Sequence, residues 1–221
     1  MNNNNHIAKK VDISRFSVII FDFDGVILDS ELAQCKAWEK ALTKFSLDTS
    51  RVDALHIIGI QDDEIVNYLV DDNNSQLREL IRKEKNTLMN LMFEAEQVKL
   101  VNGLEDAIKR LSKTHTLAIA SNAKPARIDS VLSKNGLQKY FDIIVTAGDR
   151  LPSKPDPAIY LEALRKIGKA NFECMVIEDS IPGLVAARKA KLYSIGITTG
   201  LPKNALEQYA NEVIHSFAQI I

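Results

Sequence analysis

Three carboxylates stand close together in the stretch FDFDGVILDS, which covers residues 21–30. Asp22 and Asp24 directly follow an apolar run, and Asp29 comes five residues later. Carboxylates at this spacing repel one another, and burying them is costly unless a positive charge compensates. At the end of a strand, residues two apart can point to the same side, so Asp22 and Asp24 can act together. They could bind a hard metal ion, or serve as a nucleophile and an acid–base group.

Two further apolar runs lead into groups that could bind an anion. Ser121 and Asn122 follow TLAIA. A hydroxyl and backbone N–H groups at a helix N-terminus make an anion site, although an ordinary helix cap is the alternative. Lys154 lies in a loop, residues 148–157, that holds three of the chain's six prolines. Their fixed φ angles stiffen the loop, which suits a lysine that meets a phosphate; an exposed lysine in a turn is the alternative.

A fourth apolar run, MVI, leads into Glu178 and Asp179. Capping of the following helix would by itself explain Asp179. Four predicted strand ends nevertheless offer two acids, a hydroxyl, a lysine and two more acids, and Gly25 allows the backbone to approach a ligand closely. Together these groups describe a Mg²⁺ ion held by oxygen atoms, facing a phosphate that Ser121 and Lys154 bind.

The elements that would position these groups form an alternating pattern. Short, continuous apolar runs predict buried strands, and the segments between them have helical patterns. This alternation indicates a parallel sheet covered on both faces, a doubly wound α/β fold. Strands are expected at Val18–Phe21, Leu117–Ala120, Ile143–Val145, Met175–Ile177, Tyr193–Ile197 and Val213–Ile214. Helices are expected near Leu104–Ser112, Arg127–Lys134, Pro157–Ile167 and Pro182–Lys189.

Residues 30–99 interrupt the alternation with a mostly helical block. The segments Glu31–Phe45 and Gln76–Val98 each place apolar residues on one helical face, and no strand is evident between them. We therefore expect a core domain of residues 1–29 and 100–221 and an inserted helical cap domain of residues 30–99. Such an insertion would stand over the carboxyl ends of the strands, where open α/β sheets bind ligands. A helical subdomain without a role in binding is the alternative.

Composition narrows the classes of partner. The 28 Lys and Arg residues nearly balance 29 Asp and Glu residues, for a formal net charge of −1. This balance gives no electrostatic reason to expect nucleic acid or an anionic membrane as a partner. Cys35 and Cys174 have no zinc or CxxC spacing, so both are expected as free thiols in a reducing compartment. Without a signal-peptide pattern or an 18-residue apolar run, a cytoplasmic protein is expected, monomeric by default.

The candidate residues resemble the four motifs of the haloacid dehalogenase superfamily of phosphotransferases. These motifs are DFDG with Asp22 and Asp24, Ser121, SKPDP with Lys154, and IEDSIPG with Glu178 and Asp179. The likeness covers nearly the whole chain, including a helical cap inserted after the first motif. It is similar to the branch that contains phosphoglycolate phosphatase, hexose-phosphate phosphatases and β-phosphoglucomutase.

The resemblance implies Mg²⁺-dependent hydrolysis of a small phosphate ester, a sugar phosphate or a phosphoglycolate-like compound, through an aspartyl-phosphate. Asp22 would attack phosphorus, and Asp24 would protonate the leaving oxygen and then accept a proton from water. The Asp22 carboxylate, the Asp24 backbone oxygen and Asp179 would bind Mg²⁺, and Glu178 would bind the metal or orient its ligands.

The same resemblance implies how the phosphoryl oxygens would be held. Lys154 and Ser121 would bind them, together with backbone N–H groups near Gly25 and Asn122. The metal and the lysine would offset the repulsion between the acids and keep Asp22 ionised.

A β-phosphoglucomutase-like mutase is the alternative within this family. Those enzymes have a cap histidine and a cap arginine where this chain has Gln34 and Asp62. Asp62 would repel a second phosphate, although Lys124 falls where the mutases have a lysine for it, so a phosphatase is expected. Gln34, Gln61 and Lys124 are further candidates for contact with the leaving group.

Two other classes of protein are weighed against this interpretation. A phospho-accepting receiver domain also uses strand-end acids, a hydroxyl and a lysine. It would be about half as long, without the helical insertion, and its turnover of phosphate esters would be slight. A catalytically inactive binding protein would be expected to lack one of the motif residues, and none is missing.

Overall fold

The computed structural model describes residues 9–71, 74–146 and 151–221. Its centre is a six-stranded sheet in the order β3-β2-β1-β4-β5-β6, in which every neighbouring pair is parallel. The predicted doubly wound sheet is confirmed. The strands are β1 (Val18–Phe21), β2 (Thr116–Ser121), β3 (Ile143–Thr146), β4 (Cys174–Glu178), β5 (Tyr193–Ile197) and β6 (Glu212–Ile214). Residues 148–150 of the proline-rich loop lie outside the described part of the chain.

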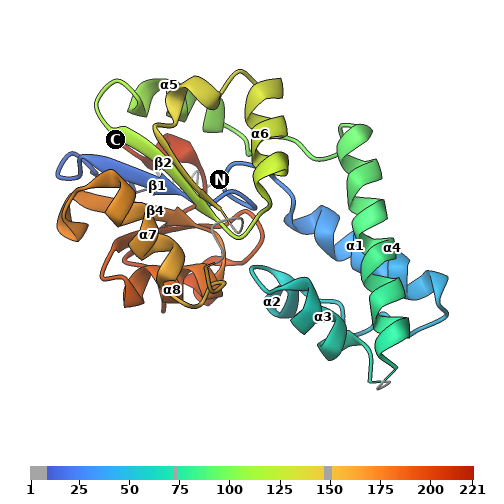
Figure 1. Ribbon diagram of the computed structural model, residues 1–221. Coiled ribbons are helices and arrows are strands. Elements are labelled where there is room, and N and C mark those ends of the chain that lie inside the picture. The colour runs from blue at the N-terminus through green and yellow to red at the C-terminus, as the bar shows by residue number, and fades with distance from the viewer. Residues whose placement is uncertain (1–8, 72–73, 147–150) are drawn as a thin grey trace, which may run out of the picture.

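Helices cover both faces of this sheet (Figure 1). Along β1, Ile19 and Phe21 belong to the apolar cluster that includes α5 (Leu104–Leu111) and α6 (Pro125–Lys134). Val18 and Ile20 belong instead to the cluster with α7 (Ala158–Ile167) and α8 (Ile181–Lys189). Burial on both sides explains why the strands read as continuous apolar runs. The remaining short elements are α9 (Lys203–Leu206), η1 (Gln138–Tyr140), η3 (Asn171–Glu173) and η4 (Phe217–Gln219).

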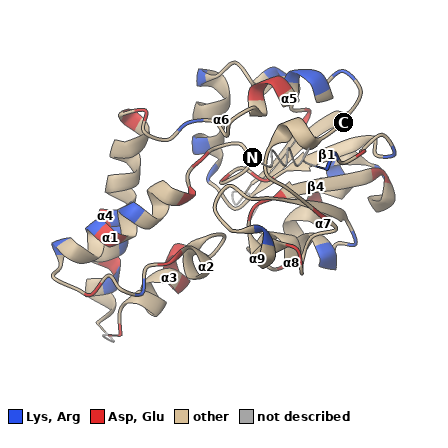
Figure 2. Ribbon diagram, turned by 180° about the vertical axis from the view of Figure 1, so that it is seen from behind, with Lys and Arg blue, Asp and Glu red and all other residues tan. Residues whose placement is uncertain are grey.

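Residues between β1 and α5 form a separate helical unit with its own apolar core. Its helices are α1 (Glu31–Lys44), α2 (Ala54–Ile57), α3 (Asp62–Leu69) and α4 (Ser75–Glu94). Trp38, the single tryptophan of the chain, is fully buried in this core. We call this set of helices the helical unit. Figure 1 shows it beyond the end of β1, beside the sheet domain, and Figure 2 shows acidic and basic residues interspersed over both parts.

The predicted long helix, Gln76–Val98 with Leu80 and Leu91 on its apolar face, is partly wrong. The helix ends at Glu94, and Leu80 and Leu91 are 46% and 54% exposed. Its buried side chains are Ile81, Lys85, Met89 and Met92. A lysine therefore occupies a position within the buried stripe, because its ammonium group is paired there, as described below.

Two linker segments connect the helical unit to the sheet domain. The Asp29 N–H donates to the Lys99 carbonyl at 2.8 Å, and the Val101 N–H donates to the Ile27 carbonyl at 3.0 Å. The side chain of Asp29 is exposed, so this third acid of the opening stretch stands at the linker, apart from the buried carboxylates at the ends of β1 and β4. Among the described residues, none of the helices combines the length and the apolar character that crossing a membrane requires.

Candidate active site

The end of β1 and the end of β4 bring two acids to one lysine. The Lys154 ammonium donates to Asp22 Oδ1 at 2.6 Å, to Glu178 Oε1 at 2.6 Å and to the Ala120 carbonyl at 3.1 Å. Lys154 and Asp22 are 6% and 7% exposed, and Glu178 is fully buried. All three N–H groups of the lysine therefore have acceptors, and two of these contacts are ion pairs with acids of the site.

Glu178 is the most heavily bonded acid of the site. Besides Lys154, the Tyr160 hydroxyl donates to its Oε1 at 2.6 Å. Its Oε2 accepts from the backbone N–H of Asp179 at 3.2 Å and from the hydroxyl of Ser180 at 3.0 Å. A Cβ atom on Gly183, in the first turn of α8, would lie 1.9 Å from Glu178 Oε1. Glycine at this position leaves room for the carboxylate.

Asp22, Glu178 and Asp179 offer carboxylate oxygens that all lie within 4.8 Å of one another, and we call these three residues the acid cluster. Among the described residues, Asp179 Oδ2 has no hydrogen-bond partner although it is buried. Gly25 has a φ of +70°, and a Cβ atom there would lie 1.8 Å from that same oxygen. A buried oxygen atom without a partner, beside a glycine that leaves it space, fits a hard cation with oxygen ligands such as Mg²⁺.

The charges of the acid cluster support this assignment. Three carboxylates face one ammonium group, so two negative charges remain when all are ionised. Burial, with the charge of Glu178, raises the pKa of Asp22 to about 7. Burial, with the charge of Glu31, raises the pKa of Asp179 well above its usual value. Although burial lowers the pKa of Lys154, the neighbouring acids raise it on balance. A divalent cation would offset this excess of negative charge.

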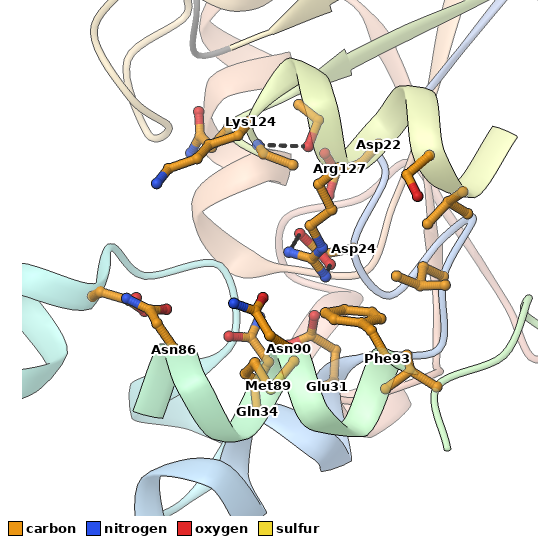
Figure 3. Close-up of a pocket in the computed structure, with 18 of the residues that line it drawn as sticks. Asp22, Asp24, Glu31, Gln34, Asn86, Met89, Asn90, Phe93, Lys124 and Arg127 are labelled. Carbon is orange, nitrogen blue, oxygen red and sulfur yellow. Dashed lines mark hydrogen bonds and ion pairs between the residues drawn. The ribbon is translucent and has the colours of Figure 1, made fainter. Parts of the chain in front are cut away.

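Asp24 has a different set of partners. Its carboxylate accepts from Arg127 Nη2 at 2.5 Å and Nη1 at 3.2 Å, and from the Ser30 hydroxyl at 2.7 Å. The guanidinium carbon of Arg127 also lies 4.6 Å from the centre of the Phe93 ring, on α4 of the helical unit. Figure 3 shows Arg127 between Asp24 and Phe93. Arg127 thus links one catalytic candidate of the sheet domain to the helical unit.

The remaining predicted phosphate ligands lie at the start of α6. Ser121 is buried, and its Oγ accepts from the Ala123 N–H at 3.1 Å. Ser121, Asn122 and Lys124 all line the same cleft, and Lys124 is exposed. Gly25 differs from its predicted role, because its N–H donates to the Leu28 carbonyl at 2.7 Å and so is not free for a phosphate. What Gly25 provides here is space for Asp179.

A cleft of about 1300 Å³ runs from Asp22 and Asp24 to the helical unit. Gln34 and Gln61, the leaving-group candidates from the sequence, both line it. Four residues from successive turns of α4 also line the cleft: Asn86, Met89, Asn90 and Phe93. Figure 3 shows their side chains facing the sheet domain. The loop between α2 and α3 covers one side, because Ile58 packs against Leu184, Leu201 and Leu206. The site thus lies between the two parts of the chain.

Glu31, at the start of α1, was not predicted as a site residue. It lines the cleft, is only 2% exposed, and has an Oε2 atom without a hydrogen-bond partner among the described residues. Burial raises its pKa to about 8, and the charges of Asp24 and Asp22 contribute. In the sequence, an acid directly before an apolar helical pattern looks like a favourable helix N-terminal residue, so nothing marked it.

Arg127, Lys85 and Tyr160 were also missed. Arg127 lies in the first turn of the helix that follows Ser121, a position that could have been examined because it faces the same sheet edge. Lys85 falls four residues after Ile81 and four before Met89, so a charge on the apolar stripe was the available signal. Tyr160 reads as an apolar core residue, and its buried hydroxyl needs a partner that only the fold supplies.

Comparison with known proteins places these features in context. The family model described as haloacid dehalogenase-like hydrolase matches residues 19–197. A bifunctional riboflavin kinase/FMN phosphatase of Arabidopsis thaliana is 30% identical over 92% of the chain, which spans about half (54%) of that protein. A fructose-1-phosphate phosphatase of Escherichia coli is 27% identical over 83% of the chain and 97% of its own length. A solved haloacid dehalogenase-like structure from Bacteroides fragilis has a TM-score of 0.80 at 23% identity, covering 92% of this chain and 99% of that one.

Proposed function

The chain belongs to the family of haloacid dehalogenase-like hydrolases, and we propose that it is a Mg²⁺-dependent phosphatase acting on a small phosphorylated metabolite, a sugar phosphate or a phosphoglycolate-like compound. The observation that carries this proposal is the buried contact of Asp22 with Lys154 and Glu178, beside the partnerless oxygen of Asp179. An oxygen nucleophile, a cation and a metal-binding acid within one buried cluster suit phosphoryl transfer.

In the proposed reaction, an Asp22 carboxylate oxygen forms a bond to phosphorus while the bond from phosphorus to the ester oxygen breaks. Asp24 gives its proton to the departing oxygen, so the product alcohol leaves neutral. Water then attacks the aspartyl-phosphate, and Asp24 takes a proton from it. The bond from phosphorus to Asp22 breaks, inorganic phosphate leaves, and both carboxylates return to their starting states.

The neighbouring groups stabilise the charge that moves in these steps. Lys154 would exchange one of its present acceptors for a phosphoryl oxygen, and Ser121 with the backbone beside Asn122 would bind another. Mg²⁺, held by Asp22, Asp179 and the Asp24 backbone oxygen, would supply Lewis-acid stabilisation of the phosphoryl group. Glu178, whose oxygens already accept five hydrogen bonds, would orient Lys154 and the backbone of Asp179.

We further propose that residues 30–99 act as a cap domain over this site. The loop that carries Ile58 packs on the sheet domain, and α4 faces Asp24 across the cleft. Burial of the reacting groups beneath such a cap would limit access of bulk water during the first transfer. Gln34, Gln61 and Lys124 line the part of the cleft where the leaving group would lie.

Phosphate release measured across a panel of metabolite phosphates with Mg²⁺ tests the proposal. Asp22→Asn should abolish release, whereas Asp29→Asn, an exposed acid of the same stretch, should leave it nearly unchanged. EDTA should stop turnover, and added Mg²⁺ should restore it. Appreciable activity of Asp22→Asn would remove the nucleophile from the scheme. Conversion of β-glucose 1-phosphate to glucose 6-phosphate without free phosphate, with a trace of the bisphosphate present, would favour the mutase instead.

A further inference from the structure

Among the described residues, two lysines are buried. One is Lys154 of the site, and the other is Lys85 on α4, which is 4% exposed and also lines the cleft. The Lys85 ammonium donates to Asp62 Oδ1 at 2.6 Å and to Gln34 Oε1 at 2.9 Å. It also lies 5.2 Å from the centre of the Trp38 ring. Two of the three N–H groups of this buried ammonium group are thus taken by acceptors of the protein itself.

Without Asp62, Lys85 would be an obvious partner for a second phosphate on the leaving group. A buried, unpaired ammonium is costly, and an incoming dianion would relieve that cost. Asp62 relieves it instead. It stands in the first turn of α3, where the helix dipole favours a carboxylate, and directly after the loop that packs on the sheet domain. The pair therefore lies wholly within the helical unit, where Asp62 of α3 meets Lys85 of α4.

Two further cations that line the cleft, one on α4 and one on α6, are also paired with acids. Arg82 lies 3.0 Å from Asp63, and Lys134 lies 2.7 Å from Glu96. In the described part of the chain, the cleft-lining lysines that form no ion pair are the exposed Lys99 and Lys124. The cap side of the cleft consequently offers little unpaired positive charge to a second anionic group.

Uncharged hydrogen-bonding groups are available on the same wall. The Gln34 carbonyl oxygen is taken by Lys85, which leaves its amide N–H groups to donate elsewhere. Asn86 and Asn90 project from α4 toward the sheet domain (Figure 3). Primary amides both donate and accept, which suits hydroxyl groups that do the same.

From this arrangement we propose that Asp62 is a specificity-determining residue: by occupying Lys85, it restricts the site to monophosphates whose leaving group is an uncharged polyhydroxylated compound and rejects a second phosphate. The inference rests on the proposed phosphatase function and adds the class of leaving group. Asp62→Asn keeps the shape of the side chain but removes its charge, so Lys85 becomes available to a dianion.

The experiment compares kcat/KM for fructose 1-phosphate and fructose 1,6-bisphosphate with Mg²⁺. The unchanged protein should prefer the monophosphate at least tenfold. Asp62→Asn should raise kcat/KM for the bisphosphate, relative to that for the monophosphate, by about tenfold or more, mainly by lowering KM for the bisphosphate. Glu64→Gln, an exposed acid of the same helical turn that is not among the residues lining the cleft, is the matched control and should leave the ratio unchanged. The double variant Asp62→Asn with Lys85→Gln should fold as an uncharged pair and lose the gain.

Three results would overturn the inference: a preference of the unchanged protein for the bisphosphate, a ratio in Asp62→Asn within twofold of the original, or a gain that survives in the double variant. Calorimetric binding of the same two sugars to Asp22→Asn and to Asp22→Asn with Asp62→Asn tests the preference without turnover. If no ester releases phosphate but binding still shifts toward the bisphosphate, the proposed function fails while the role of Asp62 stands. Unshifted binding refutes that role whatever the turnover.

Discussion

Replacement of Gly183 by alanine sets two effects of opposite sign against each other. Gly183 lies in the first turn of α8 and has no positive φ, so alanine there would ordinarily stabilise the helix by about 1 kcal/mol. Its Cβ atom, however, would lie 1.9 Å from Glu178 Oε1. Lys154 and Tyr160 both donate to that oxygen at 2.6 Å, so the carboxylate cannot shift without weakening both hydrogen bonds.

The structure therefore predicts a net loss for Gly183→Ala. Hydrogen bonds to a charged group contribute about 1.5–3 kcal/mol each. Loss of the two, less the gain in helix propensity, leaves a destabilisation of roughly 2–5 kcal/mol. For a chain of this length that lowers Tm by about 10 °C. Because Lys154 contacts Asp22 as well, kcat should also fall, by about tenfold or more.

Thermal unfolding and phosphate release, measured on the same preparations, check this prediction. Gly196→Ala is the matched control, because a Cβ atom there would meet its nearest neighbours at 3.4 Å, an ordinary contact. It should change Tm far less than Gly183→Ala and keep kcat. A Gly183→Ala protein with unchanged or higher Tm and normal kcat would refute the conclusion that Glu178 is held rigidly by its partners.

Two further predictions concern residues that the sequence did not single out. Arg127→Met should lower kcat by about a hundredfold or more, because Asp24 loses two charge-assisted hydrogen bonds of about 1.5–3 kcal/mol each. Arg165→Met on the surface should leave kcat unchanged, and equal kcat in both variants would contradict a positioning role for Arg127. The pKa of Glu31 is about 8 in the folded protein and 4.5 for an ordinary glutamate. Between these pH values the folded protein holds a proton on Glu31 that the unfolded chain has lost. The stability of the metal-free protein should therefore fall as pH rises from about 5 to 8. Glu31→Gln should flatten that slope in EDTA, measured by Tm against pH, and the exposed Glu207→Gln should retain it; identical slopes in all three proteins would contradict burial of an ionisable Glu31.

Much of the fold could be predicted because its signals are local. The apolar runs at Val18–Phe21 and Tyr193–Ile197 coincide with strands β1 and β5, and the glycines and prolines mark where helices begin and end. Once the strands are parallel, their carboxyl ends meet at one edge of the sheet. Asp22, Lys154 and Glu178 are then expected at the same edge of the sheet, and the distances of 2.6 Å from Lys154 to both acids agree with this expectation.

Other features depended on how each helix is rotated about its own axis, which the spacing of apolar residues in the sequence does not define. The exposed Leu80 and Leu91 show that the buried stripe of α4 is turned from the one predicted, because Lys85 takes a place within it. A hydrophobic pattern treats every charged residue as exposed, whereas Lys85 is buried because another helix supplies a partner for its charge. Here the partner is Asp62, 23 residues away.

The sequence by itself determined the class of fold, the helical insertion and the set of strand-end groups, since each of these depends on residue type and spacing along the chain. Tertiary structure alone decided which charges neutralise each other: Arg127 with Asp24 across 103 residues, Lys85 with Asp62, and Glu31 buried without a partner for one oxygen. The physical reason is that the positions of strands and helices along the chain follow from local patterns, while an ion pair requires two side chains to meet within about 3 Å, which small rotations of packed helices permit or prevent.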